Sequence, residues 1–169
     1  MISVIISLVV IIADQLSKFF VVEHLKPVGN IPIIKGILDF SYVENRGAAF
    51  GMLSDNRVIF MAASVAIIAL LLYIIYKYRG QNKLFDISMG FILGGGVGNM
   101  IDRIRLGYVI DFVDFCAFDF WKWVFNIADS AVVVGCILAI ICLILEQKTG
   151  KSIFDENTVK EDNGEKKDE

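Results

Sequence analysis

Apolar runs of membrane-spanning length dominate the chain, and shorter polar stretches separate them. Four such runs occupy residues 1–22, 58–76, 84–103 and 124–145. A helix needs about 20 mostly apolar residues to cross the hydrocarbon core of a bilayer. The pattern therefore predicts four transmembrane helices. Residues 58–76 contain no charge and form the clearest of these runs.

The segment between the first two runs has a different pattern. Residues 23–56 contain both prolines, and the isoleucine-rich part from residue 31 shows the partial alternation typical of strands. We expect a small antiparallel sheet on the membrane surface there. The predicted fold class is therefore a mainly α membrane protein with four transmembrane helices and a small extracytoplasmic β-sheet. Residues 1–148 form the membrane domain, and residues 149–169 form a charged cytoplasmic tail.

Composition supports this class and excludes others. Hydrophobic residues make up 56% of the 169 residues, with a mean hydropathy of +0.66, against about 45–50% in soluble domains. Acids and bases balance before Glu146, so the net charge of −3 belongs to the tail. Nothing in this balance indicates nucleic-acid binding. With no CxxC motif and one histidine, we expect no metal or other cofactor, and we expect a monomer.

Basic residues set the expected orientation. Lys77, Arg79 and Lys83 crowd the short turn between the second and third runs, and such a turn is typical of the cytoplasmic side. Both termini are then cytoplasmic, while residues 23–56 and 104–123 lie outside. The chain is then expected to cross its membrane four times.

Polar residues at the outer ends of the runs are the candidate site. Asp14 and Lys18 are four residues apart on one helix face and can form an ion pair. The third run ends, and the fourth begins, with further polar residues that share helix faces: Asn99, Asp102, Arg103, Asn126 and Asp129. Asp111 lies on the link between these two runs. In the expected orientation, all of these side chains meet near the outer interface.

Two carboxylates in this set can perform peptide hydrolysis. When two carboxylates lie close together in a medium of low dielectric, one takes the proton and the other keeps its charge. The ionised member can deprotonate water, and the protonated member can stabilise the developing oxyanion. We expect Asp111 and Asp129 to be this pair. Asp114 and Asp119 are expected to be solvated loop residues.

Two other classes remain as alternatives. A proton-coupled membrane transporter also buries carboxylates in helices, although it should show internal repeats, and this sequence shows none. A serine–lysine hydrolase would use Ser17 with Lys18, or Ser130. Adjacent residues on a helix do not face each other, which weakens the first of these pairs.

Five motifs resemble one family closely. They are DQLSK at residues 14–18, NRGAAF at 45–50, GNMIDR at 98–103, VIDF at 109–112 and FNIADS at 125–130. They span the chain from the first predicted helix to the fourth, and together they are highly specific. The sequence resembles the bacterial lipoprotein signal peptidases (signal peptidase II, aspartic peptidase family A8).

The resemblance implies an aspartic endopeptidase that cuts prolipoproteins before a diacylglyceryl-modified cysteine and that globomycin-type cyclic peptides inhibit. It implies the bacterial cytoplasmic membrane as the location, and Asp111 and Asp129 as the catalytic pair. The supporting polar residues that it implies are Asp14, Lys18, Asn45, Gly47, Asn99, Asp102, Arg103 and Asn126. Gly90, Gly94 and Gly98 form a smooth stripe, which favours close helix packing. We also expect the substrate's apolar signal helix to pack beside this stripe or its neighbours.

Overall fold

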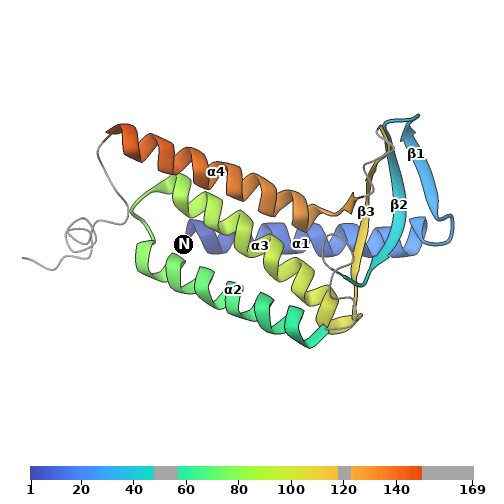
Figure 1. The fold of residues 1–169 in the computed structure, drawn as a ribbon, viewed down its shortest axis with the longest axis horizontal. Coiled ribbons are helices and arrows are strands. Elements are labelled where there is room, and N and C mark those ends of the chain that lie inside the picture. Colours follow the sequence, from blue (N-terminus) through green and yellow to red (C-terminus); the bar gives the residue numbers. More distant parts are fainter. Residues whose placement is uncertain (48–56, 118–122, 150–169) are drawn as a thin grey trace, which may run out of the picture.

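The computed structural model describes residues 1–47, 57–117 and 123–149. Within these ranges the chain forms long helices and one sheet (Figure 1). The helices are α1 (Ile2–Phe20), which continues as the π-helical segment η1 (Val21–Leu25), α2 (Arg57–Tyr78), α3 (Lys83–Arg105) and α4 (Ile127–Thr149). The strands are β1 (Asn30–Ile34), β2 (Leu38–Asn45), β3 (Val109–Phe115) and β4 (Val124–Phe125).

All four predicted transmembrane helices are present. In the described part of the chain, four helices are long and apolar enough to cross a membrane. They differ in how much of each is buried inside the protein. In the most apolar 18-residue stretch of α3, 56% is buried, whereas in that of α2 only 6% is buried. Helix α3 is therefore the centre of the bundle, and α1, α2 and α4 pack around it.

Glycines let α3 approach its neighbours closely. A Cβ at Gly90 would lie 2.8 Å from the Ser3 carbonyl oxygen, and one at Gly94 would lie 2.9 Å from that of Ser7. The Gly90 and Gly94 positions are thus filled by α1, which confirms the prediction of close helix packing. Residues of α1 fill the space at Gly90 and Gly94 themselves, so packing of a substrate helix beside this stripe or its neighbours stays a prediction.

The sheet stands across one end of the bundle (Figure 1). Its strand order is β1-β2-β3-β4, with every neighbouring pair antiparallel. The β1–β2 hairpin turns at Gly36, whose φ of 74° suits glycine. The strand pairing confirms the predicted small antiparallel sheet. The isoleucine side chains of the β1–β2 hairpin are exposed, namely those of Ile31, Ile33, Ile34 and Ile37.

The fourth helix begins later than predicted. Hydropathy predicts that Val124 and Phe125 belong to this helix, but they form β4 and pair with Asp114 and Val113 of β3. Hydropathy cannot separate two apolar strand residues from the helix that follows them. The helix starts at Ile127.

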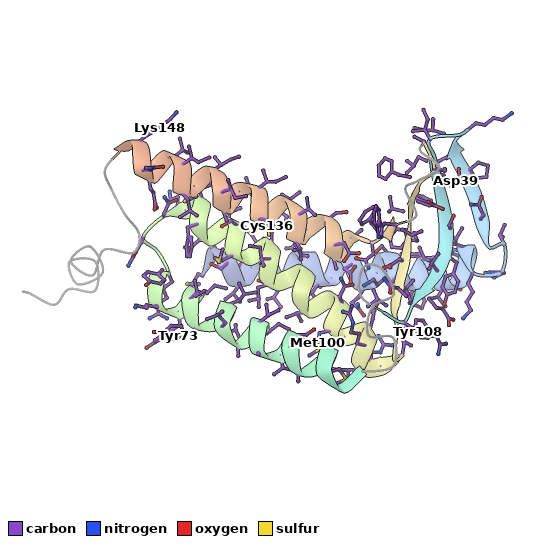
Figure 2. All side chains as sticks on the ribbon, in the orientation of Figure 1. Asp39, Tyr73, Met100, Tyr108, Cys136 and Lys148 are labelled. Carbon is purple, nitrogen blue, oxygen red and sulfur yellow. The ribbon has the colours of Figure 1, made fainter. Side chains whose placement is uncertain are left out.

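A hydrophobic cluster fills the opposite end of the bundle. It is built around Phe85, Met89 and Leu93 of α3, with Ile75 of α2 and Cys142 of α4. In Figure 2, Tyr73 and Lys148 mark this end, and Asp39 and Tyr108 mark the sheet end. The bundle thus has one end with an apolar cluster and one end capped by the sheet.

Candidate active site

Asp111 and Asp129 come together where the sheet meets the helices. Asp111 lies on β3 and is 2% exposed, and Asp129 is half-buried in the first turn of α4. Asn126 bonds to both of them. Its Nδ2 donates to Asp111 Oδ1 at 2.6 Å, and its backbone N–H donates to Asp129 Oδ2 at 3.2 Å. The two carboxylates are therefore neighbours, as the sequence predicted.

The contact between Asn126 and Asp129 also starts α4. Asp129 N donates to Asn126 Oδ1 at 2.9 Å, and Asn126 N donates to Asp129 Oδ2. This reciprocal pair is a capping box, which satisfies backbone donors at a helix N-terminus. The same two hydrogen bonds fix the position of the Asp129 carboxylate at the N-terminus of α4.

Asn45 holds Asp111 from the other side. Its Nδ2 donates to Asp111 Oδ2 at 2.8 Å, while its Oδ1 accepts from Gly47 N at 3.1 Å. Strand β2 delivers Asn45 here because Val43 pairs with Asp111 in the β2–β3 register. Gly47 thus acts by orienting the Asn45 amide so that its donor faces the carboxylate.

Asn99 on α3 links Asp129 to a buried cation. Its Oδ1 accepts from Lys18 Nζ at 2.9 Å and from Asn126 Nδ2 at 3.1 Å. An ammonium can only donate hydrogen bonds, so the oxygen must face Lys18. The amide nitrogen then faces Asp129 and donates to Oδ1 at 2.8 Å.

Lys18 lies between two buried carboxylates. Its Nζ is 2.8 Å from Asp14 Oδ2 and 2.9 Å from Asp102 Oδ2. The three residues are between 0% and 3% exposed. The predicted Asp14–Lys18 pair is confirmed, and Asp102 joins it as a second partner. Gly98 makes room, because a Cβ there would lie 2.7 Å from Asp14 Oδ2.

Backbone amides complete the bonding of these two carboxylates. Asp14 Oδ1 accepts from Ala128 N at 3.0 Å, and Asp102 Oδ2 accepts from Ile110 N at 3.2 Å. Buried carboxylates are costly unless they are paired and hydrogen-bonded. Here both requirements are met, by residues from α1, α3, α4 and β3.

Gln15 is a site residue that the sequence reasoning did not single out. Its Nε2 lies 2.9 Å from Asp102 Oδ1, 3.2 Å from Asp14 Oδ2 and 3.2 Å from the Gly98 carbonyl oxygen. An uncharged side chain next to a charged one gives little signal by itself. The available signal was its place in the DQLSK motif, one residue after Asp14.

Arg103 and Asp114 behave differently from the rest. Arg103 Nη1 donates to the Asn99 carbonyl oxygen at 3.4 Å, so it contacts the site through the backbone of α3. Asp114 lies farther along β3, where it accepts from Ser41 Oγ at 3.0 Å. Asp119 lies outside the described residues.

The surroundings of Asp111 make its protonation easier. Burial raises the pKa of Asp111 to about 6, and the neighbouring charge of Asp129 also raises it. Hydrogen bonds from Asn45 and Asn126, and the charge of Lys18, oppose this rise. Because Asp129 lies beside it, the two carboxyl groups can hold one proton between them. The pair can then act as acid and base together.

Comparisons with known proteins agree with this architecture. Residues 6–145 match the family described as signal peptidase (SPase) II. The chain is similar to a lipoprotein signal peptidase of Halothermothrix orenii, with 47% identity over 86% of this chain and 97% of the relative. It is also similar to one of Caldanaerobacter subterraneus subsp. tengcongensis, with 45% identity over 76% of this chain and 86% of the relative.

A solved structure has the same fold. It is described as a bacterial membrane enzyme and matches with a TM-score of 0.78 and 32% identity over 89% of this chain and 92% of that one. The family match covers the sheet, the helices apart from the outermost residues of α1 and α4, and every residue of the site described above. This chain therefore belongs to the signal peptidase II family.

Proposed function

We propose that this protein is an aspartic endopeptidase that removes signal peptides from prolipoproteins, with Asp111 and Asp129 as its catalytic pair. One observation carries the residue assignment: Asn126 bonds to both carboxylates where the sheet meets the helix bundle. The substrate class follows from the relatives, which are lipoprotein signal peptidases.

The reaction needs one proton shared by the pair. The ionised carboxylate takes a proton from water as the oxygen of that water attacks the scissile carbonyl carbon. The protonated carboxyl gives its proton to the carbonyl oxygen, which stabilises the tetrahedral intermediate. Return of a proton to the amide nitrogen then allows the C–N bond to break. Asn45, Asn99 and Asn126 keep both acids in place through these steps.

The site lies at a depth suited to a lipid-anchored substrate. A diacylglyceryl group contributes about 0.8 kcal/mol per buried CH₂ toward membrane binding, and it fixes the modified cysteine near headgroup depth. The bond before that cysteine then lies level with the ends of the helices, where Asp111 and Asp129 meet. We infer that the enzyme cuts before the lipidated cysteine and that membrane lipid surrounds the substrate. Globomycin-type peptides are the inhibitors that we expect to compete there.

The orientation that we propose puts the sheet outside the bacterial cytoplasmic membrane. Lys77 and Lys83 lie at the bundle end away from the sheet, as does Lys148 at the end of α4. Clustered bases are typical of cytoplasmic loops. Both termini are then cytoplasmic, and the active site is near the extracytoplasmic face of a monomer.

The alternatives have less support. The relatives are peptidases, which does not support a proton-coupled transporter. A serine–lysine hydrolase needs a lysine that can act as a base, but Lys18 is bound by two carboxylates. The hydroxyls of both candidate serines donate to backbone carbonyl oxygens and not to a general base. Ser17 Oγ donates to the Asp14 carbonyl oxygen at 2.7 Å, and Ser130 Oγ donates to that of Asn126.

Asparagine substitutions test the catalytic pair. Asp111→Asn and Asp129→Asn should each abolish cleavage of a purified lipidated precursor, because an amide can neither activate water nor share the proton. Asp114→Asn is the matched control on the same strand and should cleave normally. Wild-type cleavage by either of the first two variants would show that the pair is misassigned.

A second experiment tests the role of the lipid. One precursor is prepared with and without its diacylglyceryl group, and both forms are followed by gel shift in the same detergent. The lipidated form should be cut much faster. Equal rates would leave a general intramembrane aspartic protease in place of a lipid-dependent one.

A further inference from the structure

Two carboxylates outside the proposed catalytic pair bind the backbone directly before it. Asp14 Oδ1 accepts from the N–H of Ala128, the residue before the catalytic acid of α4, at 3.0 Å. Asp102 Oδ2 accepts from the N–H of Ile110, the residue before the catalytic acid of β3, at 3.2 Å. Each catalytic acid is therefore held by its own buried carboxylate, one from α1 and one from α3.

These two carboxylates are joined by two donors. Lys18 Nζ lies within 2.9 Å of both Asp14 and Asp102. Gln15 Nε2 makes a second bridge, at 3.2 Å from Asp14 Oδ2 and 2.9 Å from Asp102 Oδ1. One ammonium cannot neutralise two carboxylates, so the neutral amide supplies the donor that the second carboxylate still needs.

We propose that Gln15 is a positioning residue for the peptidase reaction. Together with Lys18, it fixes the separation of Asp14 and Asp102, and these two carboxylates transmit that separation through the backbone amides to the catalytic pair. The inference rests on the proposed function, because it takes Asp111 and Asp129 as the pair. The family match by itself assigns no role to Gln15.

The pH–rate profile reports how strongly the two catalytic carboxyl groups interact. Two interacting carboxyl groups titrate as a unit, and the gap between their apparent pKa values grows with their interaction. The two limbs of the pH–rate profile report these values. If the acids move apart, the limbs should move toward each other. Among the described residues, the charged groups nearest the pair are Asp14 and Lys18 on α1 and Asp102 and Arg103 on α3. Glu44 and Arg46, next to Asn45 in the sequence, pair with each other.

The test uses Gln15→Leu, with Gln147→Leu at the exposed end of α4 as the matched control. Loss of one neutral bridge should lower kcat for a lipidated precursor by about tenfold, with KM unchanged and with both limbs of the pH–rate profile closer together. The control should match the wild type in all three measurements. Gln15→Glu keeps the size of the side chain and adds a third carboxylate, so its kcat should fall further.

Two results would overturn the positioning role of Gln15. A wild-type kcat with unmoved limbs in Gln15→Leu or Gln15→Glu would overturn the proposal. So would a lower yield of folded protein with a wild-type kcat per folded molecule, because that result assigns Gln15 to stability alone. Failure of the proposed function is separate: cleavage by Asp111→Asn or Asp129→Asn would show it, whatever the Gln15 variants do.

Discussion

The two ends of α3 are buried in different ways. At the sheet end, Asn99 and Asp102 bond to Lys18 and to the amides of the site. At the far end, Phe85 and Met89 sit in a hydrophobic cluster. One helix therefore carries both the polar contacts of the active site and the apolar contacts that stabilise the bundle.

Each end also contains a buried aspartate, and the two are held differently. Asp86, at the far end, accepts from Ser3 Oγ and from Gly80 N, both at 3.2 Å. Asp102 accepts from Lys18 and Gln15. Neutral donors bind the carboxylate at the far end, whereas the sheet end, where four acids converge, includes a buried cation. The sheet end therefore depends on charge balance and the far end on packing.

Removing the cation should have the largest effect. Lys18→Met leaves Asp14 and Asp102 close together without a positive charge, and breaking a buried ion pair costs about 3–5 kcal/mol. It also frees the Asn99 amide that orients Asp129. We expect both a lower melting temperature in detergent and loss of cleavage. Retention of both properties would show that charge balance is unimportant at the sheet end.

Truncation at the far end should separate stability from activity. Phe85→Ala removes a side chain that is 4% exposed, and such changes cost about 3–5 kcal/mol. The melting temperature should fall, while kcat per folded molecule stays at the wild-type value at temperatures where the variant is folded. A large fall in kcat under those conditions would contradict the division between the two ends.

The pH dependence of stability should depend on Asp111. Its pKa is raised from 3.8 to about 6 in the folded protein, so the folded state binds the proton more tightly than the unfolded state. The resulting stabilisation is fully present below pH 3.8 and is lost as the pH rises through about 6. The shift corresponds to stability on the order of 3 kcal/mol. Melting curves on either side of this window should show the loss in the wild type and a smaller one in Asp111→Asn.

Adjacent glycines on α3 give the smallest effect and a matched control. A Cβ at Gly95 would overlap the Ala128 carbonyl oxygen, whereas one at Gly96 would lie 3.9 Å from Ile68 Cγ1. Gly95→Ala should therefore force α3 and α4 apart beside Asp129, at a cost of about 1–3 kcal/mol. Gly96→Ala should be tolerated. Equal melting temperatures and cleavage rates in the two variants would show that the α3–α4 contact is not tight.

The helices could be predicted from the sequence, but the details of the site could not. Runs of about 20 apolar residues have few alternatives to spanning helices, so all four were found. Spacing placed Asn99 and Asp102 on one face of a helix. It could not show that Asp102 reaches the amide of Ile110, because that contact depends on how β3 returns to the bundle.

The sequence does not predict the structure correctly where hydropathy fits two kinds of element or carries no information about a contact. Val124 and Phe125 read as helix because apolar strand and helix residues look alike over two positions. The Asn126–Asp129 spacing could have indicated the true helix start, since it fits a capping box. Gln15 carries no charge and interrupts an apolar run only slightly, so only the folded arrangement shows its contacts with two acids.

The central place of α3 also orders the biogenesis of the enzyme. Helices α1 and α2 make little contact with each other, and both pack on α3, which is synthesised after them. In this arrangement, α1 and α2 gain their main shared helix partner only once α3 has been inserted. The proposed catalytic acids come later still, from β3 and α4. On the proposed assignment, a nascent chain that stops before α4 lacks one acid of the pair, and we expect such a partly made peptidase not to cut other signal peptides at the site of membrane insertion.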